Sequence, residues 1–354
     1  MKRSHQSSHQ PRISAKAVLS GAAIAVSAAA AIVIQRNRVR SSAGKVVVIT
    51  GGSRGLGLAL AEEFGRHGAS LVLAARSKGE LAEAKRRILD SGIGTTPDRL
   101  FTVDCDLTKT EEAQKLIDAA LQHFGRLDVL INNAGVIHVG PIEKQSIEMY
   151  REAMNSNFFS MLHTTYAVLP YMLKRREGAI VNIASIGGKV PVPHLAPYSA
   201  SKFAAAGFSE TLSAELKSKG IRVTTVNPGL MRTGSYPNAM FVGQTDKEYR
   251  WFALSASMPG LAHSAGYAAR KIYRAVARGR AEIEVGLDAY LAARIHGIAP
   301  TVTQFLGSLA ESVILPGPAG TAVGAQGTEL ETPRPKAWKR WSAKLTRDFN
   351  QPNA

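Results

Sequence analysis

Short apolar runs alternate with amphipathic stretches between residues 46 and 285, and this alternation restricts the possible folds more than any other feature of the sequence. The first run, 46–49, contains only Val and Ile, which is typical of a strand buried on both faces of a sheet. Further strands are expected at 70–74, 100–103, 129–131, 179–183, 222–226 and 281–285, and helices at 55–67, 78–91, 110–124, 146–173 and 197–217. Strands that alternate with helices imply right-handed crossovers. The sequence therefore predicts an α/β fold, a doubly wound parallel sheet of the Rossmann type with strand order 3-2-1-4-5-6-7.

The segments on either side of this alternation differ from it in charge. Residues 1–45 contain eight basic residues and no Asp or Glu, and residues 331–354 contain six basic residues against two acidic ones. The formal net charge of +17 therefore belongs mainly to the flanks, whereas a nucleic-acid-binding core would gather basic residues on one folded face. We expect no nucleic-acid partner, and we divide the chain into a basic segment 1–44, one folded domain 45–316, and a linker with a basic tail, 317–354.

An uncharged stretch of eighteen residues, 17–34, lies between Lys16 and Arg36. As a helix it would be about 27 Å long, close to the hydrocarbon thickness of a bilayer, so we expect an N-terminal apolar helix that anchors the chain in a membrane. Two alternatives stay open: a signal peptide cleaved after the small residues 27–29, and an Ala-rich helix packed on the protein. Four basic residues precede the stretch and four follow it, so the positive-inside rule does not orient it.

The sequence offers no plausible set of metal ligands. A single cysteine, Cys105, excludes an intrachain disulfide and a thiolate cluster. His5 and His9 have a spacing that suits one helical face, but no third ligand accompanies them in this polar segment. We therefore expect no metal site and a structural role for Cys105.

A long segment, 234–264, interrupts the alternation after the sixth strand. It is rich in aromatic residues: Tyr236, Phe241, Tyr249, Trp251 and Phe252. An insertion at this place lies at the ligand-binding edge of a doubly wound sheet. We therefore expect it to form a lid over an apolar substrate.

A glycine-rich turn, Thr50-Gly51-Gly52-Ser53-Arg54-Gly55-Leu56-Gly57, follows the first strand directly. Glycines at this place let the backbone approach a pyrophosphate, which then rests on the positive end of the next helix. The second strand ends in Ala74-Ala75-Arg76-Ser77, without the acidic residue that usually binds the ribose hydroxyls of NAD. Arg76, with Arg54 in the turn, would instead neutralise a 2′-phosphate. The sequence therefore predicts NADP(H) rather than NAD(H).

Tyr198 and Lys202 are four residues apart at the start of a predicted helix, so their side chains share one face. A nearby ammonium favours the phenolate and lowers the pKa of a phenol, whose ordinary value is about 10. Ser185, at the end of the fifth strand, would place its hydroxyl near a substrate carbonyl that exchanges a proton with Tyr198. His194, four residues before Tyr198, either lines the substrate pocket or has a surface or packing role.

Taken in order, these motifs resemble those of the short-chain dehydrogenase/reductase family over roughly residues 45–233. The turn 50–57 is similar to the family's T-G-x-x-x-G-x-G, residues 132–135 to its N-N-A-G, and residues 198–202 to its Y-x-x-x-K. Residues 228–233 resemble P-G-x-V-x-T with a Met in the place of Val.

Three further positions carry the resemblance. Asp106 and Leu107 are similar to the family's adenine-contacting pair after the third strand. Asn157 stands where the family has its catalytic Asn, and Asn155 is a poorer match.

The resemblance implies a role for each matching residue. Tyr198 would be the general acid in carbonyl reduction, and Lys202 would lower its pKa and hold the nicotinamide ribose. Ser185 would orient the carbonyl, and Asn157 would hold the water of a proton relay. The implied cofactor site consists of Thr50, Gly51, Ser53, Arg54, Gly55, Leu56, Gly57, Arg76, Asp106, Leu107, Asn133, Ala134, Gly135, Tyr198, Lys202, Pro228, Gly229 and Thr233.

These observations together predict an NADP(H)-dependent oxidoreductase of class EC 1.1.1.-. It would reduce a carbonyl, or oxidise a secondary alcohol, of an apolar or lipid-like molecule. The alternative is a non-catalytic NADP(H)-binding sensor or membrane scaffold of the same fold. The resemblance suggests a homo-oligomer. NADPH is a cytosolic reductant and a single cysteine fits a reducing compartment, so we expect the catalytic domain to face the cytoplasm, with a soluble cytoplasmic protein as the alternative.

Overall fold

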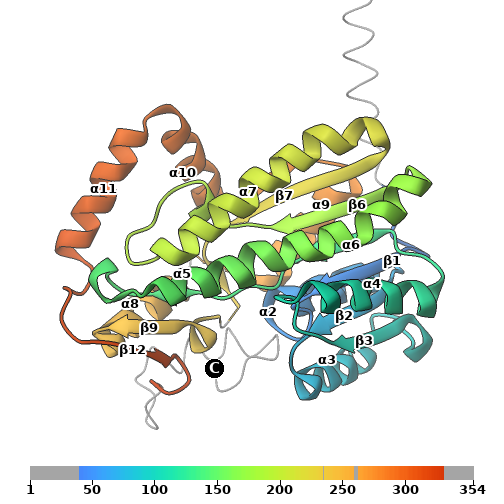
Figure 1. Cartoon of the computed structure of the whole chain (residues 1–354), viewed down its shortest axis with the longest axis horizontal. Helices are drawn as coiled ribbons and strands as arrows, with labels where there is room; N and C mark the ends of the chain where they lie inside the picture. Colours follow the sequence, from blue (N-terminus) through green and yellow to red (C-terminus); the bar gives the residue numbers. More distant parts are fainter. Residues whose placement is uncertain (1–39, 234, 259–261, 331–354) are drawn as a thin grey trace, which may run out of the picture. The chain divides into compact units, whose positions relative to one another are not determined.

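The central sheet of the computed structural model contains seven parallel strands (Figure 1). The structure describes residues 40–233, 235–258 and 262–330. In sheet order the strands are β3 (Leu100–Asp104), β2 (Ser70–Ala75), β1 (Val46–Thr50), β4 (Val129–Asn132), β6 (Gly178–Ile183), β7 (Ile221–Pro228) and β11 (Glu282–Val285). Counted along the chain within this sheet, the order is 3-2-1-4-5-6-7, so the predicted Rossmann fold is confirmed. The predicted apolar helix at 17–34 lies outside the described residues.

Helices cover both faces of the sheet and enclose a core on each face. One face carries α2 (Gly55–Arg66), α3 (Lys78–Asp90) and α9 (Ala265–Ala277), and the other carries α4 (Thr110–Phe124), α6 (Ser160–Arg175) and α7 (Ala196–Leu216). In β1, Val47 and Ile49 belong to the first core and Val46 and Val48 to the second, because successive residues of a strand face opposite sides. This burial on both faces explains the β-branched run from which the strand was predicted.

A π-helical turn divides the helix predicted at 146–173. The first part is α5 (Ile147–Met154), the π turn is Asn155–Phe159, and α6 follows from Ser160. A π turn adds one residue to the helical turn and so changes which side chains face the protein interior. Here Asn157 is buried and Asn155 is exposed.

Several short elements, most of them in the chain after β7, were not predicted from the sequence patterns. A three-stranded sheet contains β5 (His138–Val139), β9 (Met240–Gly243) and β12 (Thr321–Gln326), and the two-residue strands β8 (Met231–Arg232) and β10 (His263–Ser264) pair with each other. Because β12 pairs with β9, the segment expected to be a linker from residue 317 contains part of the fold. Three helices complete the region: α8 (Thr245–Ser255), α10 (Leu287–Ile298) and α11 (Pro300–Val313). In the described part of the chain, no helix combines the length and apolarity needed to cross a bilayer.

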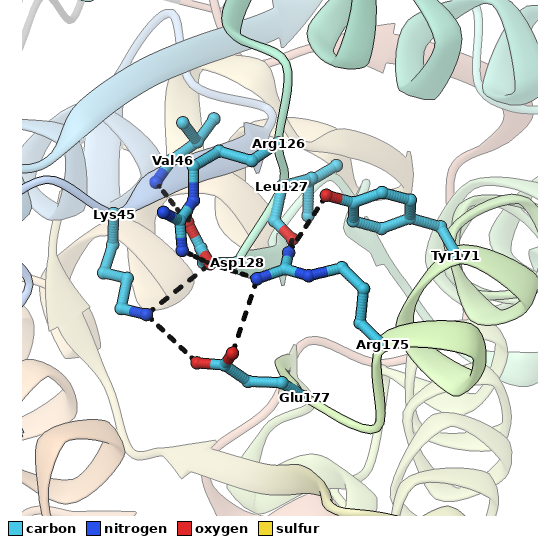
Figure 2. Close-up of polar contacts among 8 residues, drawn as sticks. All are labelled: Lys45, Val46, Arg126, Leu127, Asp128, Tyr171, Arg175 and Glu177. Carbon is cyan, nitrogen blue, oxygen red and sulfur yellow. Dashed lines mark hydrogen bonds and ion pairs between the residues drawn. The ribbon is translucent and has the colours of Figure 1, made fainter.

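Asp128 joins β1, β4 and α6 at the amino-terminal edge of the sheet (Figure 2). Its carboxylate accepts hydrogen bonds from the backbone N–H of Val46 (2.9 Å) and from the guanidinium groups of Arg126 (2.6 Å) and Arg175 (3.3 Å). The ammonium of Lys45 lies 3.6 Å from the same carboxylate. Burial works to raise the pKa of Asp128, but the hydrogen bonds from Arg126 and Val46 and the nearby positive charges hold that pKa below its usual value. The ionised carboxylate therefore stabilises the folded state.

The substitution Asp128→Asn is expected to lower the free energy of unfolding by about 2 kcal/mol at pH 7, because it removes charged hydrogen bonds from a buried acceptor. A carboxyl whose pKa is depressed on folding stabilises the protein above its unfolded pKa of about 3.9, and this stabilisation disappears as the pH falls through the folded pKa. Urea unfolding at pH 7 and at pH 3 should therefore show a smaller difference between the two proteins at the lower pH.

A matched control removes the second carboxylate of the same cluster. The side chain of Glu177 is 57% exposed, so Glu177→Gln should change the free energy of unfolding by less than about 1 kcal/mol. Equal losses for the two variants, or an Asp128→Asn loss that does not shrink at pH 3, would contradict this account.

Candidate active site

A cavity of about 410 Å³ lies at the carboxyl ends of the sheet strands. All residues predicted for the catalytic and cofactor sites line it, except Thr50 and Gly57. Its floor is therefore formed by turns that follow β1, β2, β3, β4, β6 and β7. Among the described residues there is no group of three or more His, Cys, Asp and Glu side chains that could hold a metal ion.

The glycine-rich turn after β1 has room for a phosphate group. Gly51 (φ +61°) and Gly55 (φ +56°) have left-handed backbone conformations that favour glycine. A Cβ atom on Gly57 would lie 2.0 Å from the carbonyl oxygen of Gly51, so no side chain fits there. Helix α2 begins at Gly55, and its N-cap residue, Arg54, makes no side-chain capping bond. The first N–H groups of a helix attract anions, so this turn fits a pyrophosphate.

Thr50 and Asn133 hold this turn against the loop that follows β4. The hydroxyl of Thr50 accepts hydrogen bonds from the backbone N–H groups of Asn133 (2.9 Å) and Ala134 (3.1 Å). The side-chain amide of Asn133 in turn donates to the carbonyl oxygens of Thr50 and Gly51, both at 3.1 Å. Thr50 is buried and does not line the cavity, so it positions the loops rather than touching a cofactor.

The two arginines predicted to bind a 2′-phosphate have different surroundings. Arg54 forms an ion pair with Glu80 at 2.6 Å, and Ser53 also donates a hydrogen bond to Glu80 (2.9 Å). Arg76 is exposed at the end of β2, where it lines the cavity. Burial works to raise the pKa of Asp106, but hydrogen bonds from Thr108 and the charge of Arg76 hold it below its usual value. Because Glu80 balances the charge of Arg54, Arg76 is the stronger candidate for a phosphate.

Cys105 lines this part of the cavity, and its surroundings favour the protonated thiol. Burial, with the charges of Glu112, Asp104 and Asp106, raises the pKa of its thiol to about 12. A thiol with such a pKa is protonated at neutral pH and is a poor nucleophile. The expected structural role of Cys105 agrees with this environment.

Tyr198 and Lys202 lie on the first turns of α7, and Ser185 follows β6. Burial raises the pKa of the Tyr198 phenol, and a hydrogen bond with Ser185 offsets only part of this effect. The ammonium of Lys202 lies 5.8 Å from the centroid of the Tyr198 ring and donates to the carbonyl oxygen of Ile183 at 2.9 Å. Burial lowers the pKa of Lys202 to about 8.

This result differs from the expectation that Lys202 lowers the pKa of Tyr198. Burial acts on both groups and favours the neutral form of each, so the phenol keeps its proton. A protonated phenol is the form that a general acid needs.

Asn157 is 1% exposed and fixes the loop after β4 to helix α7. Its side-chain oxygen accepts a hydrogen bond from the N–H of Val136 (2.8 Å), and its amide nitrogen donates to the carbonyl of Val136 (3.1 Å) and to the hydroxyl of Ser201 (2.9 Å). The π turn directs Asn157 inward, so the structure brings this residue to the cavity together with Tyr198 and Ser185.

His194 does not line the cavity but has a packing role, the second of the two roles considered for it. It is buried with a left-handed backbone (φ +62°), and its Nδ1 atom lies 2.9 Å from Glu248, which is fully buried. The indole N–H of Trp251 donates to the same carboxylate at 2.6 Å. Two polar residues far apart in sequence thus tie α8 to the segment before α7, a pairing that no local sequence pattern signals.

The aromatic segment 234–264 is organised differently from the expected lid. Tyr236, Phe241, Tyr249 and Phe252 are buried in a small core of their own and do not line the cavity. These rings pack against one another and against Tyr198, and the lid over a substrate stays a prediction. The residues that reach the cavity here are polar: Ser235 and Asn238 from this segment, and Gln326 from β12.

A family model described as short chain dehydrogenase matches residues 45–239. The chain belongs to this family. It is 41% identical over 202 residues to 11-beta-hydroxysteroid dehydrogenase A of Sesamum indicum, a match that spans 56% of each chain, little more than half of either. It is 36% identical over 249 residues to dehydrogenase/reductase SDR family member 7B of Mus musculus, with 70% of this chain and 75% of that one covered.

Among solved structures, a short chain dehydrogenase/reductase of Burkholderia phymatum in complex with NAD has a TM-score of 0.67 and 27% identity, with 74% of this chain and 96% of that chain covered. As a member of the short-chain dehydrogenase family, the protein belongs to a group of oxidoreductases that bind a nicotinamide cofactor. The glycine turn and the Tyr198–Lys202 pair lie within the matched residues 45–239 and line the cavity.

Proposed function

We propose that this short-chain dehydrogenase is an NADP(H)-dependent enzyme that reduces a carbonyl, or oxidises a secondary alcohol, of an apolar, lipid-like substrate. The observation that carries the proposal is that Ser185, Tyr198, Lys202 and Asn157 line one cavity together with the glycine turn and Arg76. A hydride donor, a proton donor and a substrate can therefore meet in one place.

Each catalytic side chain has a distinct task in carbonyl reduction. When bound, the nicotinamide cofactor supplies the hydride. Tyr198 gives its phenolic proton to the carbonyl oxygen, and the Ser185 hydroxyl donates a hydrogen bond that orients the same oxygen. Lys202 holds the cofactor ribose and offers a positive charge to the developing phenolate. Asn157 fixes the loop around this group, and in the family scheme it holds the water that returns a proton to Tyr198.

The preference for NADP(H) rests on the end of β2. Ala75 stands where an acidic residue would bind ribose hydroxyls, and Arg76 is exposed beside it on the cavity wall. A guanidinium matches the geometry of a phosphate, whereas a carboxylate would repel it.

The lining of the cavity supports a substrate that has apolar surface together with a further polar group. Val136, Ile137 and Met231 contribute apolar surface, and Asn238 and Gln326 contribute amides. A flat, multi-ring alcohol or ketone with a second oxygen has this distribution. The relative from Sesamum indicum carries a hydroxysteroid dehydrogenase name, which agrees with such a substrate class.

The alternative function is a non-catalytic NADP(H)-binding sensor or membrane scaffold. A sensor needs the glycine turn and Arg76 but not the proton-donating group, so the presence of Tyr198, Ser185 and Lys202 in the cavity favours an enzyme.

The proposal is tested by incubating the full chain with NADPH and a panel of multi-ring and long-chain ketones while NADPH absorbance is followed. Turnover of at least one apolar ketone supports an enzyme. NADPH binding without turnover of any ketone, and NADP⁺ binding without turnover of the matching alcohols, would favour the sensor.

We also propose that residues 17–34 anchor the enzyme in a membrane, that the catalytic domain faces the cytoplasm, and that the protein forms a homo-oligomer. The eighteen uncharged residues between Lys16 and Arg36 support the anchor. The exposed side chains of Ile147, Phe159 and Phe203 on and between α5 and α7 offer apolar surface for a second copy.

Protease added outside intact cells or spheroplasts is expected to leave the catalytic domain uncut, because the bilayer separates them. Permeabilised cells are the control and should show digestion. Rapid cleavage in intact cells, or a mature N-terminus that begins after Ala29, would show an exported protein and contradict the anchor.

A further inference from the structure

Helices α10 and α11 form a hairpin, drawn in orange at the left of Figure 1, that leaves one apolar face uncovered. No side chain of α11 is buried, and α10 buries only Ala289. Eleven of the nineteen exposed large hydrophobic residues in the described part of the chain lie within residues 287–314. Scattered exposed apolar residues are ordinary, but a contiguous cluster of this kind marks an interaction surface.

The apolar residues of α11 form a single stripe. Val302, Phe305, Leu306, Leu309 and Val313 follow a spacing of three and four residues, which places them on one side of the helix. Their side chains are between 49% and 73% exposed. About half or more of the surface of each stripe residue is therefore open to solvent, whereas the apolar residues of a hairpin that completes a core are buried.

The charged groups of the hairpin hold it to the domain and leave the stripe uncharged. Of the three charged residues between 287 and 314, Asp288 lies 2.9 Å from the His263 ring and Arg294 lies 3.6 Å from Glu284. The third is Glu311, which is not part of the stripe. The hairpin is thus attached to the domain through its polar residues and leaves its apolar side free. A helix that lies in a lipid interface also has one polar and one apolar side.

We propose that the α10–α11 hairpin docks on an anionic phospholipid bilayer, with its stripe at the boundary between headgroups and acyl chains. The rest of the sequence favours lipid over a second copy of the chain as the occupant. Residues 331–354 contain six basic residues together with Trp338 and Trp341, a combination suited to an anionic interface. Binding through this surface would add to the proposed anchoring by residues 17–34. The docking proposal depends neither on that anchor nor on the proposed reaction.

Docking at this place would set the mouth of the active site beside the membrane. The carboxylate of Asp288 approaches the cofactor loop so closely that a Cβ atom on Gly229 would lie 2.8 Å from it. A Cβ atom on Gly307 of α11 would lie 3.6 Å from Pro193, in the segment that leads to Tyr198. The hairpin therefore borders the active site, and an apolar substrate would enter from the lipid phase.

The test uses residues 41–354 and flotation with vesicles of phosphatidylcholine and phosphatidylglycerol. The described residues from 41 onwards contain the whole central sheet and both cores, so residues 41–354 are expected to fold without the N-terminal segment. The double change Phe305→Glu with Leu309→Glu should lower the vesicle partition coefficient at least about tenfold, because two apolar side chains lose their lipid contact. Tyr166→Glu, at a 63% exposed position on α6, is the matched control and should bind like the unchanged protein.

Two outcomes would overturn the proposal. Equal vesicle binding by the double variant would show that the basic tail alone binds lipid. A dimer in sedimentation velocity that the double variant dissociates, without vesicle binding by the unchanged protein, would assign the stripe to a second copy. Vesicle binding is measured without NADPH or substrate, so a protein that lacks the proposed activity would still answer the question.

A second measurement covers the case in which the double variant does not fold. Cys105 is the only cysteine and is buried, so a fluorophore attached to Leu309→Cys would report on that position alone. Addition of the same vesicles should shift its emission to the blue, and a fluorophore on Tyr166→Cys should not respond. An unchanged emission at position 309 would overturn the proposal.

Discussion

Replacing Tyr198 by Phe is expected to lower kcat for carbonyl reduction by about 10²- to 10⁴-fold, the usual contribution of a positioned acid or base. The variant loses one hydroxyl and keeps the ring that packs beside Lys202, so NADPH binding should be almost unchanged. Because burial keeps the phenol protonated, the loss falls on the step that donates a proton. Single-turnover kinetics with NADPH, and a separate titration of NADPH binding by fluorescence, measure the two effects.

The control for this variant is Tyr166→Phe, which removes a hydroxyl from an exposed position on α6. It should leave both kcat and NADPH binding at the level of the unchanged protein. A Tyr198→Phe protein with the rate of the unchanged enzyme would show that another group donates the proton. A parallel loss of NADPH binding would mean that Tyr198 acts on the cofactor instead.

The double change Ala75→Asp with Arg76→Leu is expected to shift the ratio of kcat/KM for NADPH over NADH by about 100-fold towards NADH. It removes a charge-assisted hydrogen bond to the 2′-phosphate and introduces a carboxylate that binds ribose hydroxyls and repels phosphate. Steady-state rates with both cofactors at a fixed concentration of one ketone measure the ratio.

Arg54→Leu is the comparison variant for the cofactor prediction. Because Glu80 forms an ion pair with Arg54, this change should affect the ratio less than loss of Arg76 does. An unchanged protein that already prefers NADH would contradict the assignment of Arg76.

Sequence patterns were sufficient for the sheet and for most of the cavity lining. The inner strands β1, β4 and β6 are short apolar runs buried on both faces, so their local composition agrees with their position in the sheet. The turns that line the cavity carry family motifs, and a motif of fixed spacing next to a predicted strand places its residues at the strand's carboxyl end. The structure therefore brings Ser185, Tyr198 and Lys202 together as predicted.

The features missed by sequence reasoning depend on contacts between distant segments. Helical periodicity does not distinguish an α-helix from one with a single π turn, so the π turn is visible only in the structure, although the family resemblance had already placed Asn157 in the site. The pairing of His194 with Glu248 joins residues 54 positions apart. The aromatic residues around Phe241 suggested a substrate lid, but aromaticity alone does not distinguish a pocket wall from a small core.

The pKa of Tyr198 is a further case. The spacing of Tyr198 and Lys202 predicts a shared helix face, but the direction of a pKa shift depends on burial, which no spacing reveals. In the structure burial exceeds the effect of the hydrogen bond with Ser185, so the pKa of the phenol rises. The sequence thus predicted the place of Tyr198 in the cavity but not the protonation state that burial favours.

The most direct test of the central claim, that this short-chain dehydrogenase transfers hydride from NADPH to an apolar carbonyl with Tyr198 as proton donor, is an isotope measurement. The full chain is incubated with NADPH in which both hydrogens at C4 of the nicotinamide are replaced by deuterium, together with multi-ring ketones, and the alcohols are analysed by mass spectrometry. We predict that one deuterium appears on the carbinol carbon of the product, at a rate that Tyr198→Phe lowers by about 10²-fold or more. Alcohol without deuterium, or deuterium transfer that is equally fast in the Tyr198→Phe protein, would contradict it.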